Sequence, residues 1–237
     1  MQKYDLDHIT HDDILNGKMI LVDKPLKWTS FDVVKYIRKS LVSKFKIKQI
    51  KVGHAGTLDP LATGLLIICI EKQTKKISEY QNQSKTYTGK FKLGETTPSY
   101  DRETKVNEVF SYDSIKEIDL KDLSLKFIGK KMQRPPIFSA IKKDGKRMYE
   151  YARQNKKVEI QEREIEIHEF NITSFSSPYV EFHIKCSKGT YIRSIANDLG
   201  AALNCGGYLS KLCRTDIGEF SLSNAMSINS FEDHINT

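Results

Sequence analysis

The chain contains short apolar runs and alternating segments that predict β-strands. Residues 18–23 are mostly apolar and end at Lys24-Pro25, which indicates a buried strand followed by a turn. Residues 65–70 are apolar without interruption, as in a strand buried on both faces. Apolar and polar residues alternate over 87–93 and 180–186, which indicates strands with one buried face. Strands with one apolar and one polar face are typical of antiparallel sheets.

Helical spacing of apolar residues is found between these strands. Apolar residues recur every three or four positions over 34–41, after Thr29 or Ser30 as a possible N-cap. The same spacing returns over 191–199. Shorter helices are expected at 123–127 and 148–153, the second after a hairpin-type turn at Asp144-Gly145. The irregular alternation of elements predicts a mixed α/β (α+β) fold with a central, largely antiparallel sheet flanked by helices.

Composition restricts the class of protein. The 237 residues are 39% hydrophobic and 29% charged, which is enough for one sizeable core. The apolar runs are far shorter than the roughly 20 residues of a membrane-spanning helix, and the acidic N-terminus does not match a signal peptide. The four cysteines lack the paired spacing of a zinc site. We therefore expect a cytoplasmic protein with an N-terminal tail over 1–16, one domain over 17–237, and no bound metal.

Charge gives the first indication of a partner. The net charge is +8, and the seven basic residues from Lys35 to Lys51 have no acid among them. A second basic stretch covers residues 121–157. Clustered positive charge suits a phosphate backbone. Lysine-rich faces exposed to water would produce the same pattern, so charge alone leaves both interpretations open.

The segment 51–64 (KVGHAGTLDPLATG) is the strongest candidate for chemistry. Its glycines allow sharp backbone paths and close approach of a ligand. Asp59 is the only acid between Lys44 and Ile70, and a lone carboxylate among basic residues should stay ionised, as a nucleophile or general base requires. The alternative is an Asp that only stabilises a turn. The segment matches neither a phosphate-binding P-loop nor a zinc deaminase.

A second candidate segment covers 186–200 (CSKGTYIRSIANDLG), where a strand turns into a helix at Gly189-Thr190. Arg193 falls in the first turn of that helix, where the helix dipole disfavours a cation. Arg193 is therefore expected to have a carboxylate or phosphate partner, unless it is an ordinary surface residue.

Together these two segments resemble the bacterial tRNA pseudouridine synthase family TruB, and the archaeal and eukaryotic Cbf5/dyskerin synthases share related motifs. Further matching motifs follow the same order over about residues 17–220. They are 21–25 with Thr29-Ser30, 85–87, Thr96-Thr97 with Asp101, 134–142, Tyr149 with Ala152-Arg153, and 212–215 with Gly218. Several specific motifs in one order make a chance match very unlikely.

The resemblance implies a pseudouridine-synthase fold and an isomerase that converts the uridine of the TΨC loop of tRNA (uridine-55) to pseudouridine without cofactor or metal. It implies that Asp59 is the catalytic carboxylate, that Tyr87 lies against the target base, and that Arg193 pairs with Asp59. The positions that match the lining of the uridine site are His54, Tyr191 and Leu212.

The resemblance also implies the partners. The substrate would be the T-arm of tRNA, with no guide RNA and no membrane, and we expect a monomer. The chain ends soon after the last motif, so we expect it to lack the C-terminal PUA domain that many relatives have. Lys27 stands where the family commonly has glycine, which implies either a different turn or an added phosphate contact.

The reaction breaks the C1′–N1 glycosidic bond, turns the uracil and joins C5 to C1′. The target nucleotide must leave its stack, and an aromatic side chain such as Tyr87 can return on the order of 1–3 kcal/mol. Asp59 could attack C1′ or C6 or assist elimination, and the sequence does not choose among these routes. Tyr87 could also take part in proton transfer from C5.

Two other functions compete with this one. A non-catalytic tRNA-binding or tRNA-folding protein would keep the basic segments and Tyr87 but could dispense with Asp59. A metal-dependent nuclease would need acids clustered near Asp59, and the sequence around Asp59 has none.

Overall fold

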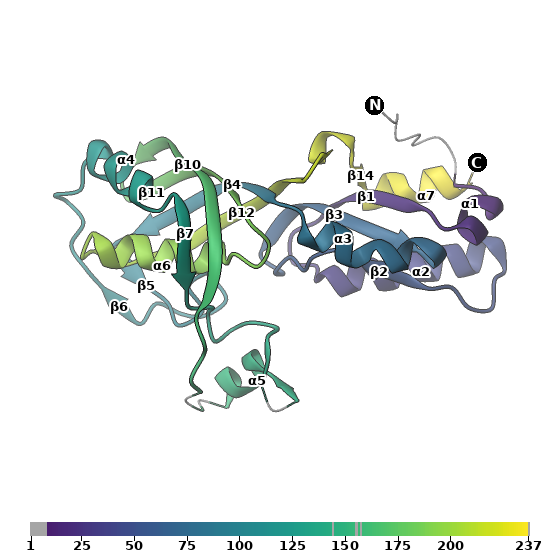
Figure 1. Ribbon diagram of the computed structural model, residues 1–237, viewed down its shortest axis with the longest axis horizontal. Coiled ribbons are helices and arrows are strands. Elements are labelled where there is room, and N and C mark those ends of the chain that lie inside the picture. The colour runs from purple at the N-terminus through teal and green to yellow at the C-terminus, as the bar shows by residue number, and fades with distance from the viewer. Residues whose placement is uncertain (1–8, 144, 155, 157, 237) are drawn as a thin grey trace. The chain divides into compact units, whose positions relative to one another are not determined.

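The computed structural model describes residues 9–143, 145–154, 156 and 158–236, and their contacts divide the chain into two compact units (Figure 1). The first unit comprises the chain up to Tyr87 and from Cys213 onwards, and the second comprises Thr88–Leu212. Strands β4 (Lys85–Leu93) and β12 (Gly207–Ile217) run from one unit into the other. The prediction of a mixed α/β fold with a largely antiparallel sheet is confirmed.

The first unit holds one end of the sheet and its covering helices. Within it the strand order is β14-β1-β3-β12, with β2 pairing with β3 and β13 with β12; β1 pairs antiparallel with β3 and parallel with β14. Its elements are α1 (His11–Asn16), β1 (Met19–Lys24), α2 (Ser30–Phe45), β2 (Val52–His54), β3 (Ala62–Ile70), η1 (Glu71–Lys76), α3 (Ile77–Asn82), β13 (Phe220–Ser221), η2 (Leu222–Asn224), β14 (Met226–Ser227) and α7 (Ile228–Asn236).

Strand β3 explains why the run at 65–70 is apolar throughout. Successive side chains of a strand point to opposite faces. Leu66 and Ile68 join a cluster with Val34 and Ile37 of α2, whereas Ile67 belongs to a second cluster on the other face. Both faces of β3 are therefore covered. A strand with alternating polar residues would bury polar side chains here, which is why every position of the run is apolar.

Helix α2 begins as the sequence predicts. Thr29 is the N-cap, and its hydroxyl accepts a hydrogen bond from the Asp32 N–H while the Asp32 carboxylate accepts from the Thr29 N–H, a capping box. Its buried face carries the apolar residues 33, 34, 37 and 41, at the predicted spacing.

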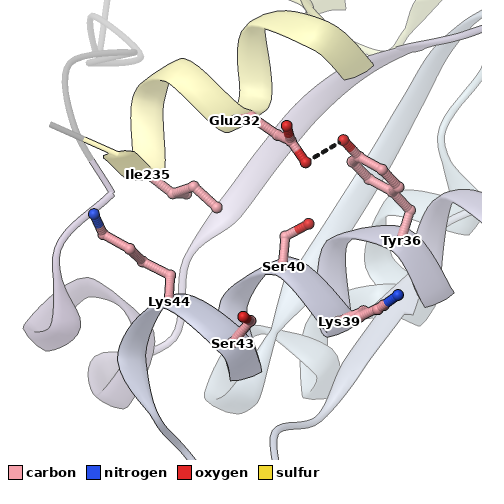
Figure 2. Close-up of a pocket in the computed structure, with 7 residues that line it drawn as sticks. All are labelled: Tyr36, Lys39, Ser40, Ser43, Lys44, Glu232 and Ile235. Atoms are coloured by element: carbon pink, nitrogen blue, oxygen red, sulfur yellow. Dashed lines mark hydrogen bonds between the residues drawn. The ribbon is translucent and has the colours of Figure 1, made fainter.

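The C-terminal helix α7 is fastened to α2 in the same unit. Figure 2 shows Tyr36 and Glu232 facing each other across the groove between these helices. The Tyr36 hydroxyl donates to Glu232 Oε1 at 2.6 Å, and this bond, with burial, raises the pKa of Tyr36 to about 12. The groove, with a volume of about 340 Å³, is also lined by Lys39, Ser40, Ser43, Lys44 and Ile235.

The second unit holds the other strands. The order within it is β4-β11-β10-β7, and β10 pairs antiparallel with both β11 and β7. Its elements are β5 (Glu95–Thr96), β6 (Glu108–Val109), α4 (Glu117–Lys126), β7 (Gly129–Gln133), β8 (Lys142–Lys143), β9 (Lys146–Arg147), α5 (Met148–Arg153), β10 (Arg163–Ser176), β11 (Tyr179–Cys186) and α6 (Ile192–Ala202). Asp144 of the expected hairpin turn lies outside the described residues, and β8 and β9 on either side of it pair antiparallel.

Aromatic packing forms the core of this second unit. The rings of Phe91 and Phe182 stack with their centroids 4.1 Å apart, and Phe170 meets Phe91 edge-on at 6.3 Å. Phe127, just after α4, packs edge-on against Phe170 at 5.8 Å. These contacts fix α4 against the strands, since aromatic pairs in such geometries stabilise beyond their buried area. Among the described residues, no helix is long and apolar enough to cross a membrane.

Candidate active site

Asp59 lies in the connection between β2 and β3 of the first unit, and its backbone is braced from several sides. The Ser30 hydroxyl accepts from the Leu58 N–H at 2.8 Å and donates to the Leu58 carbonyl at 3.3 Å. The Lys27 N–H donates to the Pro60 carbonyl at 2.8 Å. These bonds hold the residues immediately before and after Asp59, so the half-buried carboxylate is presented from a rigid loop.

Lys24, at the end of β1, supplies a buried cation to this loop. Its side chain is 0% exposed, and its ammonium group donates to the carbonyls of Trp28 at 2.6 Å and Pro25 at 2.9 Å. Burial lowers the pKa of Lys24 to about 8; the Asp59 carboxylate acts in the opposite direction and Arg214 in the same direction as burial. Lys24 therefore fixes the 25–28 turn and places positive charge near Asp59.

Arg214 of β12 is a second buried cation in the first unit. It is 1% exposed, and its guanidinium donates to the carbonyl of Leu65 at 2.8 Å and to that of Gly56 at 3.0 Å. One planar group thus ties the start of the loop to strand β3. Its backbone also passes close to Gly64, where a Cβ would meet the Arg214 carbonyl oxygen at 2.3 Å, and Gly64 has a φ of 103°. Only glycine fits there.

His54 is the last residue of strand β2 and immediately precedes the loop that carries Asp59. Burial, then the charge of Arg214, lowers its pKa below the ordinary histidine value, and the backbone of Gly56 opposes this shift. The imidazole is consequently neutral at physiological pH. A neutral, half-buried ring suits contact with an uncharged base more than contact with a phosphate.

The depressed pKa of Lys24 predicts a dependence of stability on pH. Because the folded protein releases this proton near pH 8 and the unfolded chain near 10.5, the unfolded state binds more protons between these values. The free energy of unfolding of the wild type should therefore rise with pH across this window, relative to Lys24→Met, which has no group to titrate. Urea denaturation of both proteins at several pH values measures this difference, and a difference independent of pH would contradict the shift.

Tyr87 lies in β4 at the boundary of the first unit and is buried. The alternation predicted for 87–93 is observed, since Lys85, Tyr87, Phe91 and Leu93 are the buried positions of this strand. The structure thus places Tyr87 and the loop of Asp59 in one unit, together with His54.

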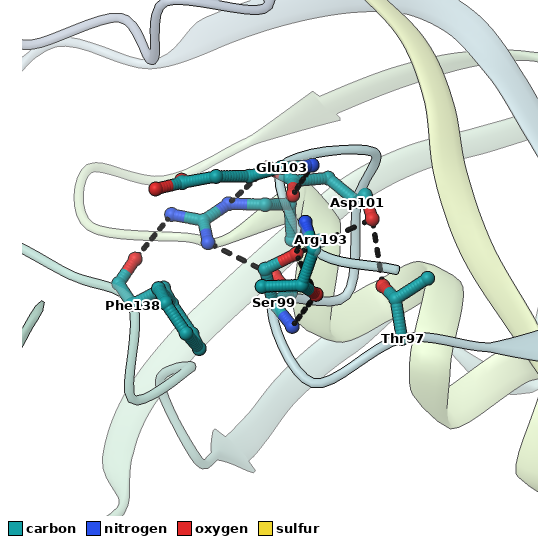
Figure 3. Close-up of polar contacts among 7 residues, drawn as sticks. Thr97, Ser99, Asp101, Glu103, Phe138 and Arg193 are labelled. Carbon is teal, nitrogen blue, oxygen red and sulfur yellow. Dashed lines mark hydrogen bonds and ion pairs between the residues drawn. The ribbon is translucent and has the colours of Figure 1, made fainter. Parts of the chain in front are cut away.

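Arg193 lies in the first turn of α6 in the second unit, and the prediction that it has a carboxylate partner is confirmed. Its Nε lies 3.6 Å from Asp101 Oδ2, and both side chains are buried. The guanidinium also donates to the carbonyls of Ser99 at 3.0 Å and Phe138 at 2.8 Å (Figure 3). Asp101 itself accepts from the Glu103 N–H at 2.9 Å. Asp59 belongs to the other unit, so its pairing with Arg193 stays a prediction.

Tyr191 and Leu212 also belong to the second unit. Tyr191 precedes α6, and its backbone is held by the buried Gln133, whose amide oxygen accepts from the Tyr191 N–H at 2.8 Å and whose amide nitrogen donates to the Tyr191 carbonyl at 3.1 Å. The guanidinium of Arg163 lies 4.6 Å from the ring centroid of Tyr191. Leu212 is buried in β12, at the boundary of the unit.

Three residues of these sites had no role assigned from the sequence: Lys24, Arg214 and Asp101. Each lies within one of the motifs named above, but a sequence motif does not reveal which residue its side chain bonds to. No local pattern marks Arg214 as buried, because Asp216 in the same strand is also charged and is only half-buried. For Asp101 the partner is 92 positions later in the chain, at Arg193, and spacing cannot reveal it.

Comparison with known proteins places the chain in a family. A family model described as TruB family pseudouridylate synthase (N terminal domain) matches residues 43–192. A tRNA pseudouridine synthase B of Flavobacterium johnsoniae is 50% identical over 228 residues, 96% of this chain and 100% of that protein. One of Parabacteroides distasonis is 44% identical over 94% of this chain and 95% of that protein.

Solved structures agree on the fold. A crystal structure of a Cbf5-Nop10-Gar1 complex contains a chain with a TM-score of 0.70 and 26% identity, matched over 94% of this chain and 55% of that one. A chain of an H/ACA RNP bound to a substrate RNA containing 2'-deoxyuridine gives a TM-score of 0.68 at 24% identity and is matched over 54% of its length. The present chain thus spans about half the length of these solved chains. On the family match and the near full-length identities, the chain belongs to the TruB family of pseudouridylate synthases.

Proposed function

We propose that this protein is a tRNA pseudouridine synthase that isomerises the TΨC-loop uridine, with Asp59 as its catalytic carboxylate. The observation that carries the proposal is the setting of Asp59. A single carboxylate is presented by a braced loop, near the buried cation Lys24, in a chain 50% identical to a tRNA pseudouridine synthase B. Lys24 supplies positive charge near this carboxylate, which in the proposal acts as the nucleophile or the general base.

The remaining predicted residues take supporting roles in this proposal. Tyr87 stacks on the flipped uracil, and neutral His54 lines the pocket on the side of the loop. Tyr191 and Leu212 complete the lining, and Arg193 orients Asp59. The family match over residues 43–192 lies within the catalytic domain proposed over 17–237. We further propose that the enzyme acts as a cytoplasmic monomer on the T-arm without guide RNA, cofactor or metal.

The experiment that tests this function is release of tritium from C5-labelled uridine in a tRNA transcript. Joining C5 to C1′ expels the C5 hydrogen, so each turnover releases one label. A matched transcript with cytidine in place of the TΨC-loop uridine, labelled only in its other uridines, is the control. Release from the first transcript alone supports the proposal. No release from either, with tRNA binding intact, would instead support a tRNA-binding or tRNA-folding protein, and release from both would contradict the assigned position.

Tyr87→Phe separates the two roles considered for Tyr87. The phenyl ring keeps the stacking surface and removes only the hydroxyl. If the hydroxyl relays the C5 proton, turnover should fall by about 10²–10⁴-fold, the usual contribution of a positioned acid or base. Single-turnover tritium release measures this, and turnover close to that of the wild type would exclude the proton role while leaving stacking in place.

A further inference from the structure

A strained turn beside the Asp59 loop has no role in the reaction described above. Lys27 has a φ of 70°, in the left-handed region that glycine adopts freely and that residues with a Cβ disfavour. Glycine, which the family commonly has at this position, adopts such a φ freely. The lysine therefore does not require a different turn from the one that glycine would form. Lys27 thus combines an exposed side chain with a strained backbone. Strained residues of this kind are concentrated at functional sites.

The position of this turn is fixed relative to the loop. The Lys27 N–H donates to the carbonyl of Pro60, the residue after Asp59, at 2.8 Å. The next residue, Trp28, packs edge-on against Tyr36 with ring centroids 5.7 Å apart, and its carbonyl accepts from Lys24. The Lys27 backbone is thus anchored beside the Asp59 loop.

An exposed aromatic residue, Phe31, follows Lys27 four positions later in the chain. Phe31, in the first turn of α2, is 53% exposed, and Leu26 beside Lys27 is 52% exposed. The ammonium group of Lys35 lies 4.9 Å from the centroid of the Phe31 ring. Exposed aromatic rings among cations are the usual elements of single-stranded nucleic-acid binding, because every base offers a π-face and every nucleotide a phosphate.

The charge of the segment fits an anionic partner. Residues 24–39 contain five basic side chains and one acid, Asp32. The Asp32 carboxylate is occupied in capping α2, since it accepts from the Thr29 N–H at 3.0 Å and the Thr29 hydroxyl at 2.6 Å. Lys27 and Lys35 are both exposed, so their charges are available to a ligand.

We propose that Lys27, Phe31 and Lys35 form a binding surface, called here the 27–35 surface, for one nucleotide of the substrate RNA next to the flipped uridine. The two ammonium groups contact its phosphate, and the Phe31 ring stacks on its base. The proposal rests on the function proposed above and adds a contact that acts on RNA affinity, with no bond made or broken.

Lys27→Gly should change stability and RNA binding in opposite directions, because it removes both the backbone strain and the charge of this lysine. Removing the Cβ relieves the left-handed strain, so the melting temperature should rise. Removing the charge should weaken binding of a tRNA transcript several-fold at low salt and reduce the slope of log K against log salt by about one. Lys27→Gln keeps the strain and loses the charge, so it should weaken binding equally without raising the melting temperature. Unchanged binding in both variants would overturn the proposal.

Lys46→Gly is the matched control. Lys46 is also an exposed lysine with a left-handed φ, 51°, but it caps the far end of α2, about 24 Å away for a 16-residue helix. Both glycine variants lose one charge and one strained residue. The proposal expects a clearly larger loss of tRNA binding for Lys27→Gly than for Lys46→Gly. Equal losses would show that net charge alone attracts the RNA, and would overturn the assignment to the 27–35 surface.

Phe31→Leu tests the stacking part and keeps an apolar side chain. Loss of one base–aromatic stack should weaken binding about tenfold, with little change in the salt slope. These binding measurements are independent of catalysis. If the wild type releases no tritium but the losses of binding remain, the proposed enzyme function fails and the surface stands. If tritium is released and the 27–35 variants bind normally, the surface fails and the function stands.

Discussion

Asp59→Asn should abolish pseudouridine formation while leaving tRNA binding nearly unchanged. The amide has the shape of the carboxylate but is neither a nucleophile nor a base at neutral pH. We expect turnover to fall by at least about 10²–10⁴-fold, the range for loss of a positioned catalytic group. Binding should persist because phosphate contacts and stacking do not need this carboxylate. Single-turnover tritium release and filter binding of the same transcript measure the two quantities.

The chain offers a matched control in Asp23. This second carboxylate also acts electrostatically on Lys24, but it is exposed on β1 rather than held in the loop. Asp23→Asn removes an equal charge and should keep activity within about twofold of the wild type, as expected for surface substitutions. In Asp59→Asn the pKa of Lys24 should fall further below about 8, because Asp59 raises it. Comparable losses of turnover in both variants would mean that charge near Lys24, and not Asp59 itself, limits the reaction.

The elements that could be predicted from the sequence are those whose pattern is local. The run at 65–70 is buried on both faces because helix α2 covers one side and Phe220 and Ile217 lie on the other, and apolar residues are required at every position. The sequence predicts Thr29 or Ser30 as the N-cap of this helix; the structure selects Thr29 and adds the reciprocal bond, in which the Asp32 carboxylate accepts from the Thr29 N–H. Such features depend on residues a few positions apart, where periodicity and capping chemistry apply directly.

The long-range contacts could not be predicted in this way. Arg214 bonds to Leu65 and Gly56, residues about 150 positions earlier, and Arg193 meets Asp101 only because the chain returns through β10 and β11. The division into two units has the same origin. Strands β4 and β12 are continuous across the boundary, so no linker composition marks it. The sequence predicts Asp59 as the catalytic carboxylate, but it does not show how the loop around Asp59 is braced.

Arg214 should prove the most sensitive of these bracing residues, and two substitutions can separate its charge from its geometry. Arg214→Met removes both hydrogen bonds and the charge. Each buried carbonyl left without a donor costs about 1–3 kcal/mol, and removal of a buried cation offsets part of this. We therefore expect a net loss of roughly 2–4 kcal/mol in the free energy of unfolding. Turnover should fall by about a hundredfold, because a loop displaced by about 1 Å no longer aligns Asp59.

Arg214→Lys keeps the charge but cannot reproduce a planar group that bonds to Leu65 and Gly56 at once. It should therefore lose turnover nearly as Arg214→Met does. The pKa of His54 distinguishes the two variants. Arg214 lowers that pKa through its charge, so the pKa should rise in Arg214→Met and stay low in Arg214→Lys. NMR titration of the His54 ring and urea denaturation measure these effects. If Arg214→Lys retained full turnover, the charge alone would support Asp59 and the bracing of the loop by the guanidinium would be unnecessary for catalysis.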